Sequence, residues 1–352
     1  FAQVDTVDRA GTLEAAQRFD IDAVITDQTD VAVPTVALVA EELGLPGIGL
    51  ETSLFFTNKK LMRDKLGGSS EFLLPQSHFF SDVRTAYEFL DSAPEGVVDW
   101  IVKPVNSQGS RGVARLTSGG WADQLAGAFA ESREKGVLLE EFIAGEEYSV
   151  ESFVLDGVTS NLAVTRKSHY ASNECIDERN LYLDDVPKNV EEMLYRATTH
   201  IVDRLGPSFC SMHTEYMVKQ GQVYLIETAA RGGGGSISGK IVPFLTDFDP
   251  SRALVQASLS EDVDVTFGSY RDAYAVMWFF CFEPGVVKAI EYDQEATVSM
   301  LHFELDLTPG SPIRPIMDAR DRPGYFVIGG QDRDSLLDQE ERFLRSFKIE
   351  YE

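Results

Sequence analysis

Residues 213–234, HTEYMVKQGQVYLIETAARGGG, decide the fold. Two apolar-rich segments flank Gln220-Gly221, and this arrangement predicts a hairpin of antiparallel strands with its turn at that dipeptide. The two predicted strands end in Glu215 and Glu227. Because side chains alternate between the two faces of a strand, the pairing register decides whether these carboxylates meet. The hairpin therefore predicts a pair of acidic side chains on neighbouring strands.

The predicted acidic pair has the chemistry of a metal site. Two like charges at close range raise each other's cost of ionisation unless a cation lies between them. Carboxylate oxygens favour Mg²⁺ or Mn²⁺, which proteins hold by one or two carboxylates together with substrate phosphates. Two solvent-exposed strand glutamates would give the same pattern, but Arg231 and the glycines at Gly232–Gly235 suit the close approach of an anionic group. We therefore expect Glu215 and Glu227 to bind a metal ion.

A second feature follows the short apolar strand predicted at residues 100–102. Lys103 ends this strand, and the glycine- and serine-rich segment Asn106–Gly112 comes directly after it. Backbone N–H groups of such a loop can turn toward phosphate oxygens, and the lysine supplies a point charge. Most loops of this composition are plain turns, so the loop alone does not establish a phosphate site. The GxxxxGK spacing at 234–240 is no P-loop, because Ile241 stands where Ser or Thr would bind Mg²⁺.

Composition excludes several classes of partner. The chain has 352 residues, with 31 Lys and Arg against 57 Asp and Glu, which gives a formal net charge of −26. A surface this negative repels nucleic acid and anionic lipid, so we expect neither as a partner. No apolar run reaches the length of a membrane helix. The three scattered cysteines lack the spacing of a disulfide framework or a zinc site, and a cytoplasmic location is expected: Cys175, Cys210 and Cys281.

The chain divides into four sections by its pattern of predicted elements. The first resembles the start of a doubly wound α/β unit, with a helix at 11–19, a strand at 23–26 and a helix that Asp30 caps and Gly44 ends. A basic helix at 58–66 follows and is the densest positive cluster of the chain. The remaining predicted elements are strands at 100–102, 137–139 and 148–150, helices at 121–135 and 190–205, and an antiparallel tail with a helix at 333–345.

Five segments, taken in order, resemble the ATP-grasp superfamily. They are TVALVAEELGLPG (35–47), NKKLMR (58–63), IVKPVNSQGSRGV (101–113), LLEEFIAGEEYSVE (138–151) and the hairpin quoted above. Each segment is modest alone, whereas their order and spacing are specific. Within the superfamily the chain is similar to carboxylate–amine ligases of the L-amino acid (dipeptide) ligase kind, over roughly residues 20–330.

This resemblance implies a mixed α/β and α+β fold with four parts. Two α+β subdomains, 58–157 and 158–260, would clamp ATP between them. A shortened Rossmann-like domain at 1–57 would precede them, and a small α+β subdomain at 261–352 would close the substrate side. The expected cofactors are ATP and Mg²⁺ or Mn²⁺.

The resemblance also implies a role for each candidate site residue. Lys59 and Lys103 would hold the ATP phosphates, and the loop Ser107, Gln108, Gly109, Ser110 and Gly112 would cover them as a lid. Glu140, Glu141, Phe142 and Ile143 would line the adenine pocket, and Glu147 would bind the ribose hydroxyl groups. Glu215 and Glu227 would bind the metal, and Arg231 would hold the substrate carboxylate and then the acyl phosphate.

The implied reaction has two steps. A carboxylate takes the γ-phosphoryl group of ATP to give an acyl phosphate, and an amine then displaces phosphate from it. His213, on the same strand face as Glu215, Glu151 or a phosphate oxygen could serve as the base, and a structural role for this histidine fits the sequence as well. The chain departs from the superfamily at Ala229, where many members have a metal-binding Asn, and at Asn58, which replaces a frequent Asp.

Two alternatives remain open on the sequence. One is a purine-pathway enzyme similar to glycinamide ribonucleotide synthetase, although no further basic loop for a phosphoribosyl group is visible. The other is a catalytically silent nucleotide-binding module that has lost a metal ligand at Ala229. The expected partners are a small carboxylate and a small amine, which residues 166–189 are a candidate to contact, and a homodimer is possible.

Overall fold

The computed structural model describes residues 2–92, 99–116, 120–265 and 273–352. Its first section is helical, and no strand forms within the described residues 2–66. The elements of this section are α1 (Arg9–Phe19), η1 (Asp30–Ala32), α2 (Val33–Leu43), α3 (Leu50–Phe55) and α4 (Lys59–Leu66).

Two expectations for the first section are wrong. Residues 23–26 form no strand, and no strand of the described chain pairs with them. Asp30 does not cap α2, which begins at Val33 after the short helix η1. The predicted end of α2 is confirmed, since Gly44 adopts the left-handed conformation (φ +67°) that terminates many helices.

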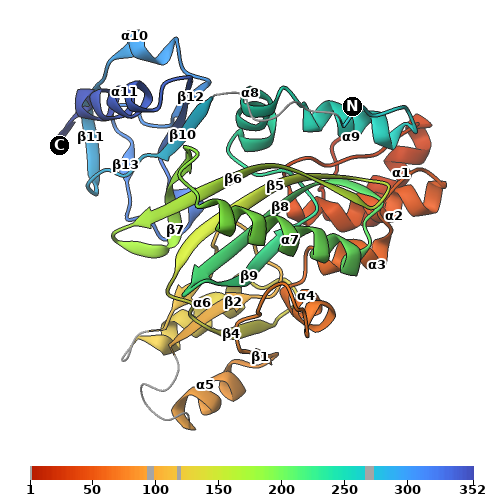
Figure 1. Ribbon diagram of the computed structural model, residues 1–352. Helices are drawn as coiled ribbons and strands as arrows, with labels where there is room; N and C mark the ends of the chain where they lie inside the picture. Colours follow the sequence, from red (N-terminus) through yellow and green to blue (C-terminus); the bar gives the residue numbers. More distant parts are fainter. Residues whose placement is uncertain (1, 93–98, 117–119, 266–272) are drawn as a thin grey trace.

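A small antiparallel sheet follows the helical section (Figure 1). Its strands, in spatial order, are β1 (Ser77–Phe80), β4 (Val137–Glu141), β2 (Trp100–Pro104) and β3 (Ala114–Arg115). The amphipathic helices α5 (Val83–Ser92) and α6 (Trp121–Glu131) pack on the sheet through a core that includes Val102, Leu125 and Leu139. The strands predicted at 100–102 and 137–139 are thus confirmed.

A larger antiparallel sheet forms the centre of the molecule. Its eight described strands have the spatial order β12-β14-β10-β7-β6-β5-β8-β9. Their bounds are β5 (Glu146–Leu155), β6 (Val158–Tyr170), β7 (Asn173–Tyr182), β8 (Phe209–Lys219), β9 (Gln222–Ala229), β10 (Tyr274–Phe279), β12 (His302–Leu305) and β14 (Gly324–Gly330). The sheet runs without interruption from the hairpin β8–β9 into the C-terminal part of the chain.

The hairpin β8–β9 turns at the predicted dipeptide. Gln220 and Gly221 both have positive φ (52° and 76°), as a two-residue turn between twisted strands requires. Residues Glu215 and Glu227 stand directly opposite each other in the ladder, and an irregularity follows at once between Glu215 and Tyr216. The two strands continue past both glutamates, so the expectation that the strands end there is wrong. Both glutamates therefore occupy paired positions within the strands β8 and β9.

Helices cover the large sheet and complete the core. α7 (Lys188–Leu205) buries Leu194 and Ile201 against β5, β8 and β9 in one hydrophobic cluster. A second cluster packs η2 (Ile237–Ile241), α8 (Val242–Thr246) and α9 (Pro250–Ser258) against the sheet. The helix predicted at 190–205 is thus confirmed, with two further residues at its beginning.

The C-terminal part contributes strands to two sheets. β10 pairs with β7, which joins β14 and β12 to the large sheet instead of leaving them in a separate tail module. A separate three-stranded sheet of β13 (Pro312–Ile313), β11 (Gly285–Glu291) and β15 (Lys348–Tyr351) lies beside them. The remaining helices are α10 (Gln294–Thr297), η3 (Ala319–Asp321) and α11 (Arg333–Ser346). The predicted helix at 333–345 is confirmed as α11.

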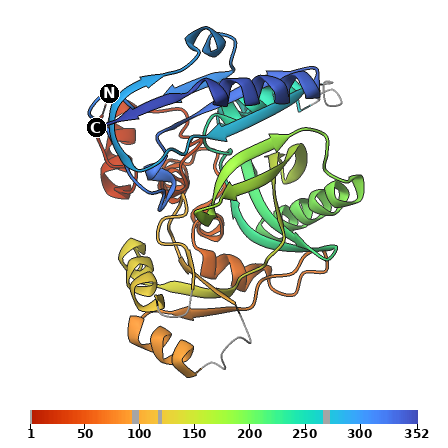
Figure 2. The same cartoon turned by 90° about the vertical axis from the view of Figure 1, so that its left-hand side faces the viewer.

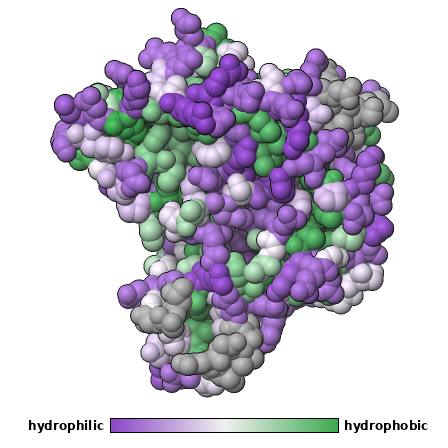
Figure 3. Space-filling model, turned by 60° about the vertical axis from the view of Figure 1, so that its left-hand side comes forward, coloured by the Kyte–Doolittle hydropathy of each residue, from purple (hydrophilic) through white to green (hydrophobic). Residues whose placement is uncertain are grey.

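The small sheet of β1, β4, β2 and β3, with its helices α5 and α6, projects from the rest of the molecule (Figure 2). On the face seen in Figure 3 the surface is hollowed above this projection, and hydrophilic side chains gather around the hollow. The arrangement confirms the expected fold of two α+β parts facing each other. The domain limits at 57, 157 and 260 stay predictions; the middle limit falls in the turn between β5 and β6. No helix among the described residues has the length and apolarity to cross a membrane.

Candidate active site

A cavity of about 300 Å³ lies between the small sheet and the large sheet. Apart from Gly112 and Glu140, every site residue that the sequence predicts lines it. These lining residues are Lys59, Lys103, Ser107, Gln108, Gly109, Ser110, Glu141, Phe142, Ile143, Glu147, His213, Glu215, Glu227 and Arg231. The structure thus brings together segments that lie as far apart in the sequence as α4 and β9.

The sequence analysis expected Glu140 to line the adenine pocket, but Glu140 does not line the cavity. Its side chain is fully buried, where its carboxylate accepts hydrogen bonds from Arg63 Nε at 2.7 Å and Nη2 at 3.2 Å and pairs with Lys103 Nζ at 2.9 Å. Burial would raise the pKa of Glu140, but Arg63 and Lys103 outweigh burial and lower it to about 2. Glu140 therefore holds Lys103 beside the cavity, while its neighbour Glu141 points into it.

Gly112 also lies outside the cavity. A Cβ atom here would stand 3.0 Å from Pro104 and 3.1 Å from the backbone of Ala128, and the residue has a φ of +69°. The glycine thus allows the loop that follows β2 to pass close to α6. Its role in the structure is to shape this loop.

The loop between β2 and β3 lies against the C-terminal half of the site. Ser110 Oγ donates a hydrogen bond of 2.9 Å to the carbonyl oxygen of Cys175 on β7, and Gly109 accepts one of 3.2 Å from the N–H of Ala319 at the start of η3. The buried polar atoms Ser107 Oγ and Gln108 Oε1 have no hydrogen-bond partner among the described residues. The loop is therefore closed over the cavity and keeps polar atoms for a ligand.

Each predicted metal-binding carboxylate is paired with a lysine. Lys59 Nζ lies 2.6 Å from Glu227 Oε1 and 3.0 Å from the carbonyl oxygen of Ser107, and Lys167 Nζ contacts Glu215 Oε1. Lys59 is the first residue of α4, and the Asn58 side chain caps that helix by accepting a hydrogen bond from the backbone. Both lysine side chains are buried, whereas Glu227 and Glu215 remain 31% and 25% exposed.

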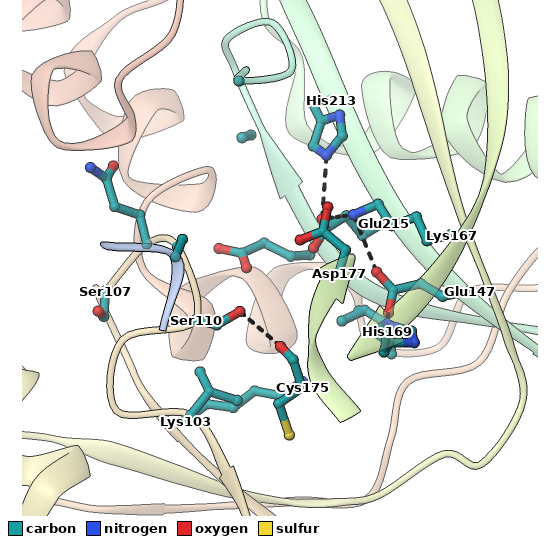
Figure 4. Close-up of a pocket in the computed structure, with 18 of the residues that line it drawn as sticks. Lys103, Ser107, Ser110, Glu147, Lys167, His169, Cys175, Asp177, His213 and Glu215 are labelled. Atoms are coloured by element: carbon teal, nitrogen blue, oxygen red, sulfur yellow. Dashed lines mark hydrogen bonds and ion pairs between the residues drawn. The ribbon is translucent and has the colours of Figure 1, made fainter. Parts of the chain in front are cut away.

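A continuous chain of charged side chains crosses the cavity (Figure 4). It joins His213, Glu215, Lys167, Glu147 and His169 in that order. The Nε2–Oε1 distance from His213 to Glu215 is 3.3 Å, and the Nζ–Oε1 distance from Lys167 to Glu147 is 3.2 Å. His169 Nε2 lies 2.8 Å from the second oxygen of Glu147. These contacts fix both glutamates on neighbouring strands of the large sheet.

The charges of this chain shift the pKa values of its members. Burial disfavours the ionised carboxyl of Glu215, but Lys167 and His213 outweigh burial and hold its pKa well below the ordinary value. Burial would lower the pKa of His213, whereas Glu151 and then Glu215 raise it to about 9. An imidazole that is protonated at neutral pH donates hydrogen bonds. This arrangement favours a role for His213 as a donor over the role of a base.

Further charged residues line the cavity: Lys167 and Asp177, from the stretch 166–189 that the sequence analysis named as a candidate to contact substrates, and Asp30 and Arg322, for which it expected no site role. Lys167 was one residue of a stretch treated only as a possible substrate loop, and its pairing with Glu147 depends on the β5–β6 register. Asp177 binds Arg322, and Arg322 and then Lys167 overcome the effect of burial and lower the pKa of Asp177 to about 2. Asp30, expected as a helix cap, lines the cavity from the first section. Only the fold places Asp30 and Arg322 at the site.

The donor set of the cavity fits Mg²⁺ in part. Glu215 and Glu227 offer the hard oxygen ligands that this ion prefers. No group of three or more His, Cys, Asp or Glu side chains among the described residues is arranged to hold a metal ion. Ala229, opposite His213 in the ladder, supplies no third ligand. Phosphate oxygens of a bound substrate would therefore have to complete the coordination.

Comparisons with protein families match two parts of the chain. Residues 97–240 match the ATP-grasp domain, and residues 278–352 match the L-amino acid ligase C-terminal domain 2. A curated phosphoribosylamine–glycine ligase from Methanosphaera stadtmanae is 34% identical over an alignment of 114 residues that covers 28% of this chain. The match spans only 23% of that enzyme's own length.

Solved structures extend the likeness to the whole fold. L-amino acid ligase from Bacillus licheniformis has a TM-score of 0.81 at 21% identity, covering 98% of this chain and 84% of the ligase. Phosphoribosylglycinamide synthetase from Anaerococcus prevotii has a TM-score of 0.73 at 14% identity, covering 100% and 88% of the two chains. At these identities the likeness shows a shared fold. The protein therefore contains an ATP-grasp domain and an L-amino acid ligase C-terminal domain, and it has the fold of the ATP-grasp ligases.

Proposed function

We propose that this protein is an ATP-dependent ligase that joins a small carboxylate to an amine through an acyl phosphate, with release of ADP and phosphate. The observation that carries the proposal is the direct pairing of Glu215 with Glu227 inside a cavity that also contains Lys59, Lys103 and Arg231. A polyphosphate and a carboxylate repel each other when they meet. The two lysines, the arginine and a metal ion bound by the two glutamates would supply the positive charge that offsets this repulsion.

The first step requires two anions to approach each other. A carboxylate oxygen of the acid attacks the γ-phosphorus of ATP, the bond to the bridging oxygen breaks, and ADP leaves with the electron pair. Two unit charges 4 Å apart at an intermediate dielectric repel by roughly 4 kcal/mol. Lys59 and Lys103 offset this repulsion on the phosphate side, and Arg231 does so on the acid side. Magnesium, held by Glu215 and Glu227, would supply further charge to the phosphates.

The second step depends on keeping water out. The amine attacks the acyl carbon, the bond to the phosphate oxygen breaks, and phosphate leaves with the electron pair while the nitrogen loses a proton. Water would destroy the acyl phosphate if it entered first. The closed loop, tied to Cys175 through Ser110 and to Ala319 through Gly109, supports a role as the lid that prevents this.

A second candidate is a ligase of the purine pathway. The local 34% identity to a phosphoribosylamine–glycine ligase favours it. Such an enzyme would need cations for a phosphoribosyl group beside those for ATP. Apart from Lys59 and Lys103, which the proposal assigns to ATP, the Lys and Arg side chains that line the cavity each pair with a carboxylate: Lys167 with Glu215, Arg231 with Asp30 and Arg322 with Asp177. These carboxylates offset part of the positive charge that a phosphoribosyl group would need, which favours a substrate with fewer negative charges.

The decisive experiment measures ADP release over a panel of amino acids, keto acids and amines, with glycine plus phosphoribosylamine as one pair. We expect release only when an acid and an amine are both present. Release with the phosphoribosylamine pair alone would favour the second candidate. No release from any pair would favour the silent nucleotide-binding module that Ala229 suggests.

Variants of the paired carboxylates test the same proposal. Glu215→Gln and Glu227→Gln should abolish turnover, because each removes one charge from the proposed metal site. Glu304→Gln is the matched control, since Glu304 is an exposed strand residue of the same sheet outside the cavity. Full turnover by either active-site variant would contradict the proposal.

A further inference from the structure

Asp30 and Arg231 form a two-point contact across the cavity wall. Arg231 Nε donates to Asp30 Oδ1 at 2.9 Å, and Arg231 Nη2 donates to Asp30 Oδ2 at 3.0 Å. The Arg231 side chain is 17% exposed and the Asp30 side chain 15%, and both residues line the cavity. Asp30 belongs to the helical first section, outside the matched ATP-grasp domain of residues 97–240. The first section thus reaches into the site through this carboxylate.

Asp30 uses only one edge of the guanidinium. A third N–H of Arg231, on Nη1, donates to the carbonyl oxygen of Gly232 at 2.9 Å. A guanidinium carries five N–H donors in a rigid plane, so two remain for another acceptor. The geometry therefore leaves Arg231 able to bind a second carboxylate while Asp30 stays in place.

The backbone around the pair is tied down on both sides. Gly232 N–H donates to the carbonyl oxygen of Asp27 at 2.8 Å, and Ser251 Oγ donates to Asp27 Oδ2 at 2.8 Å. A Cβ atom on Gly232 would lie 3.4 Å from Asp27 Oδ1, so the glycine run and the segment of Asp27 are closely packed here. These bonds tie the segment that precedes Asp30 to the residue that follows Arg231.

Arg231 has other anions within reach of its charge. Burial lowers the pKa of Arg231, Asp30 raises it most strongly, and Glu227 and Glu215 raise it further. Without Asp30, the guanidinium would be attracted to these two carboxylates, which the proposed metal ion needs. The carboxylate that the guanidinium contacts in the structure is that of Asp30.

We propose that Asp30 is a positioning residue that holds one edge of the Arg231 guanidinium so that its two free N–H groups receive the carboxylate of the acid substrate. This inference rests on the ligase function proposed above. Asp30 touches neither ATP nor the reacting carbon in this scheme and acts only through Arg231. The acid substrate should carry one carboxylate and no second anionic group, because Asp30 already places a negative charge beside the site where Arg231 binds that carboxylate.

The test compares steady-state kinetics of Asp30→Asn with those of the wild type, using the L-amino acid and the amine that give most ADP in the panel. We expect the KM for the amino acid to rise about tenfold or more and the KM for ATP to change less than about twofold. Glu340→Gln is the matched control, because Glu340 pairs with an arginine (Arg179), is 5% exposed and lies outside the cavity. An unchanged or lower KM for the amino acid in Asp30→Asn would overturn the inference.

A double-variant cycle separates positioning from general destabilisation. Because Asp30 is proposed to act through Arg231, Asp30→Asn should add little to the loss of kcat/KM in an Arg231→Gln background. A full additional loss there would contradict the proposal. A thermal melt of each variant checks that the fold is intact.

A crystal structure of Asp30→Asn gives a readout that needs no turnover. The inference expects the Arg231 guanidinium to leave its position and approach Glu227, and an unmoved Arg231 overturns it. If the wild type makes no ADP with any acid and amine, the ligase proposal fails, while this structure still decides whether Asp30 positions Arg231.

Discussion

The ammonium group of Lys59 lies 2.6 Å from the carboxylate of Glu227, although 168 positions separate the two residues in the chain. The pair joins the start of α4 to the strand β9, and so connects the proposed phosphate-binding lysine to the proposed metal ligand. A bound nucleotide would have to share this lysine with Glu227. The contact therefore links nucleotide affinity to the state of the metal site.

Replacing this lysine should weaken nucleotide binding. Lys59→Met removes a buried charge that would face the phosphates, and we expect the Kd for ATP to rise about tenfold or more. Titration with a fluorescent ATP analogue measures the change. The adjacent Lys60→Met is the control, since Lys60 is partly exposed and pairs with Asp64 on the surface of the same helix. Equal effects of the two substitutions would contradict a specific role for Lys59.

Removing the charge of Glu140 should destabilise the fold. Glu140→Gln leaves Arg63 and Lys103 buried without their shared counter-ion, which typically costs about 3–5 kcal/mol. Urea unfolding at pH 7 measures the loss. Glu146→Gln, an exposed residue of β5, should change the free energy of unfolding by less than about 0.5 kcal/mol. A similar small change for Glu140→Gln would show that the buried pairs contribute little.

The effect of Glu140 should also depend on pH. Its pKa is about 2 in the folded protein against an ordinary value of 4.5, so the folded state favours the ionised form. The resulting stability is complete above pH 4.5 and is lost as the pH falls toward 2. The difference in unfolding free energy between the wild type and Glu140→Gln should therefore narrow between pH 5 and pH 3. A difference that stays constant over this range would contradict the lowered pKa.

The sequence predicted the hairpin and its acidic pair because the signal is local. The turn dipeptide and the strands beside it fix the register of Glu215 and Glu227 over a short stretch. The lysine and the loop after β2 were predicted for the same reason. Alternation along β4 could in principle have separated Glu140 from Glu141, but the sequence alone does not say which face of that strand meets the cavity.

The remaining parts of the site depend on contacts that are distant in sequence. Asp30 has the local appearance of a helix cap, and only the packing of the first section against the glycine run turns it toward Arg231. Lys167 becomes a partner of Glu215 because β6 and β8 lie on either side of β5. The segment 23–26 shows the opposite error, since a strand-like sequence forms no strand without a neighbour.

Opening the loop should uncouple ATP use from ligation. Ala319→Pro removes the N–H that binds the carbonyl oxygen of Gly109, at a first helical position where proline is tolerated. We expect more phosphate release per product formed, because water reaches the acyl phosphate. Parallel measurements of ADP and of the ligated product give this ratio. Ala319→Gly keeps the N–H and should keep the wild-type ratio, and a normal ratio in Ala319→Pro would show that this contact does not hold the loop closed.

The glycine run after β9 should tolerate a methyl group at one position and not at another. A Cβ atom on Gly232 would lie 2.3 Å from Ser238 Cβ and 2.6 Å from its Oγ, whereas a Cβ atom on Gly234 would meet nothing within 4 Å. Gly232→Ala should therefore cost about 1–3 kcal/mol of stability through overpacking, and Gly234→Ala should cost far less. Thermal melts of the two variants make the comparison.

The origin of the Gly232 effect can be checked by removing the obstacle. Ser238 is 1% exposed and begins to clash only when the methyl group is added, so Ser238→Gly should restore part of the stability that Gly232→Ala loses. A favourable coupling energy in this double-variant cycle would identify the contact between the two side chains as the cause. Strictly additive losses would instead mean that the contact with Ser238 is not the cause of the lost stability.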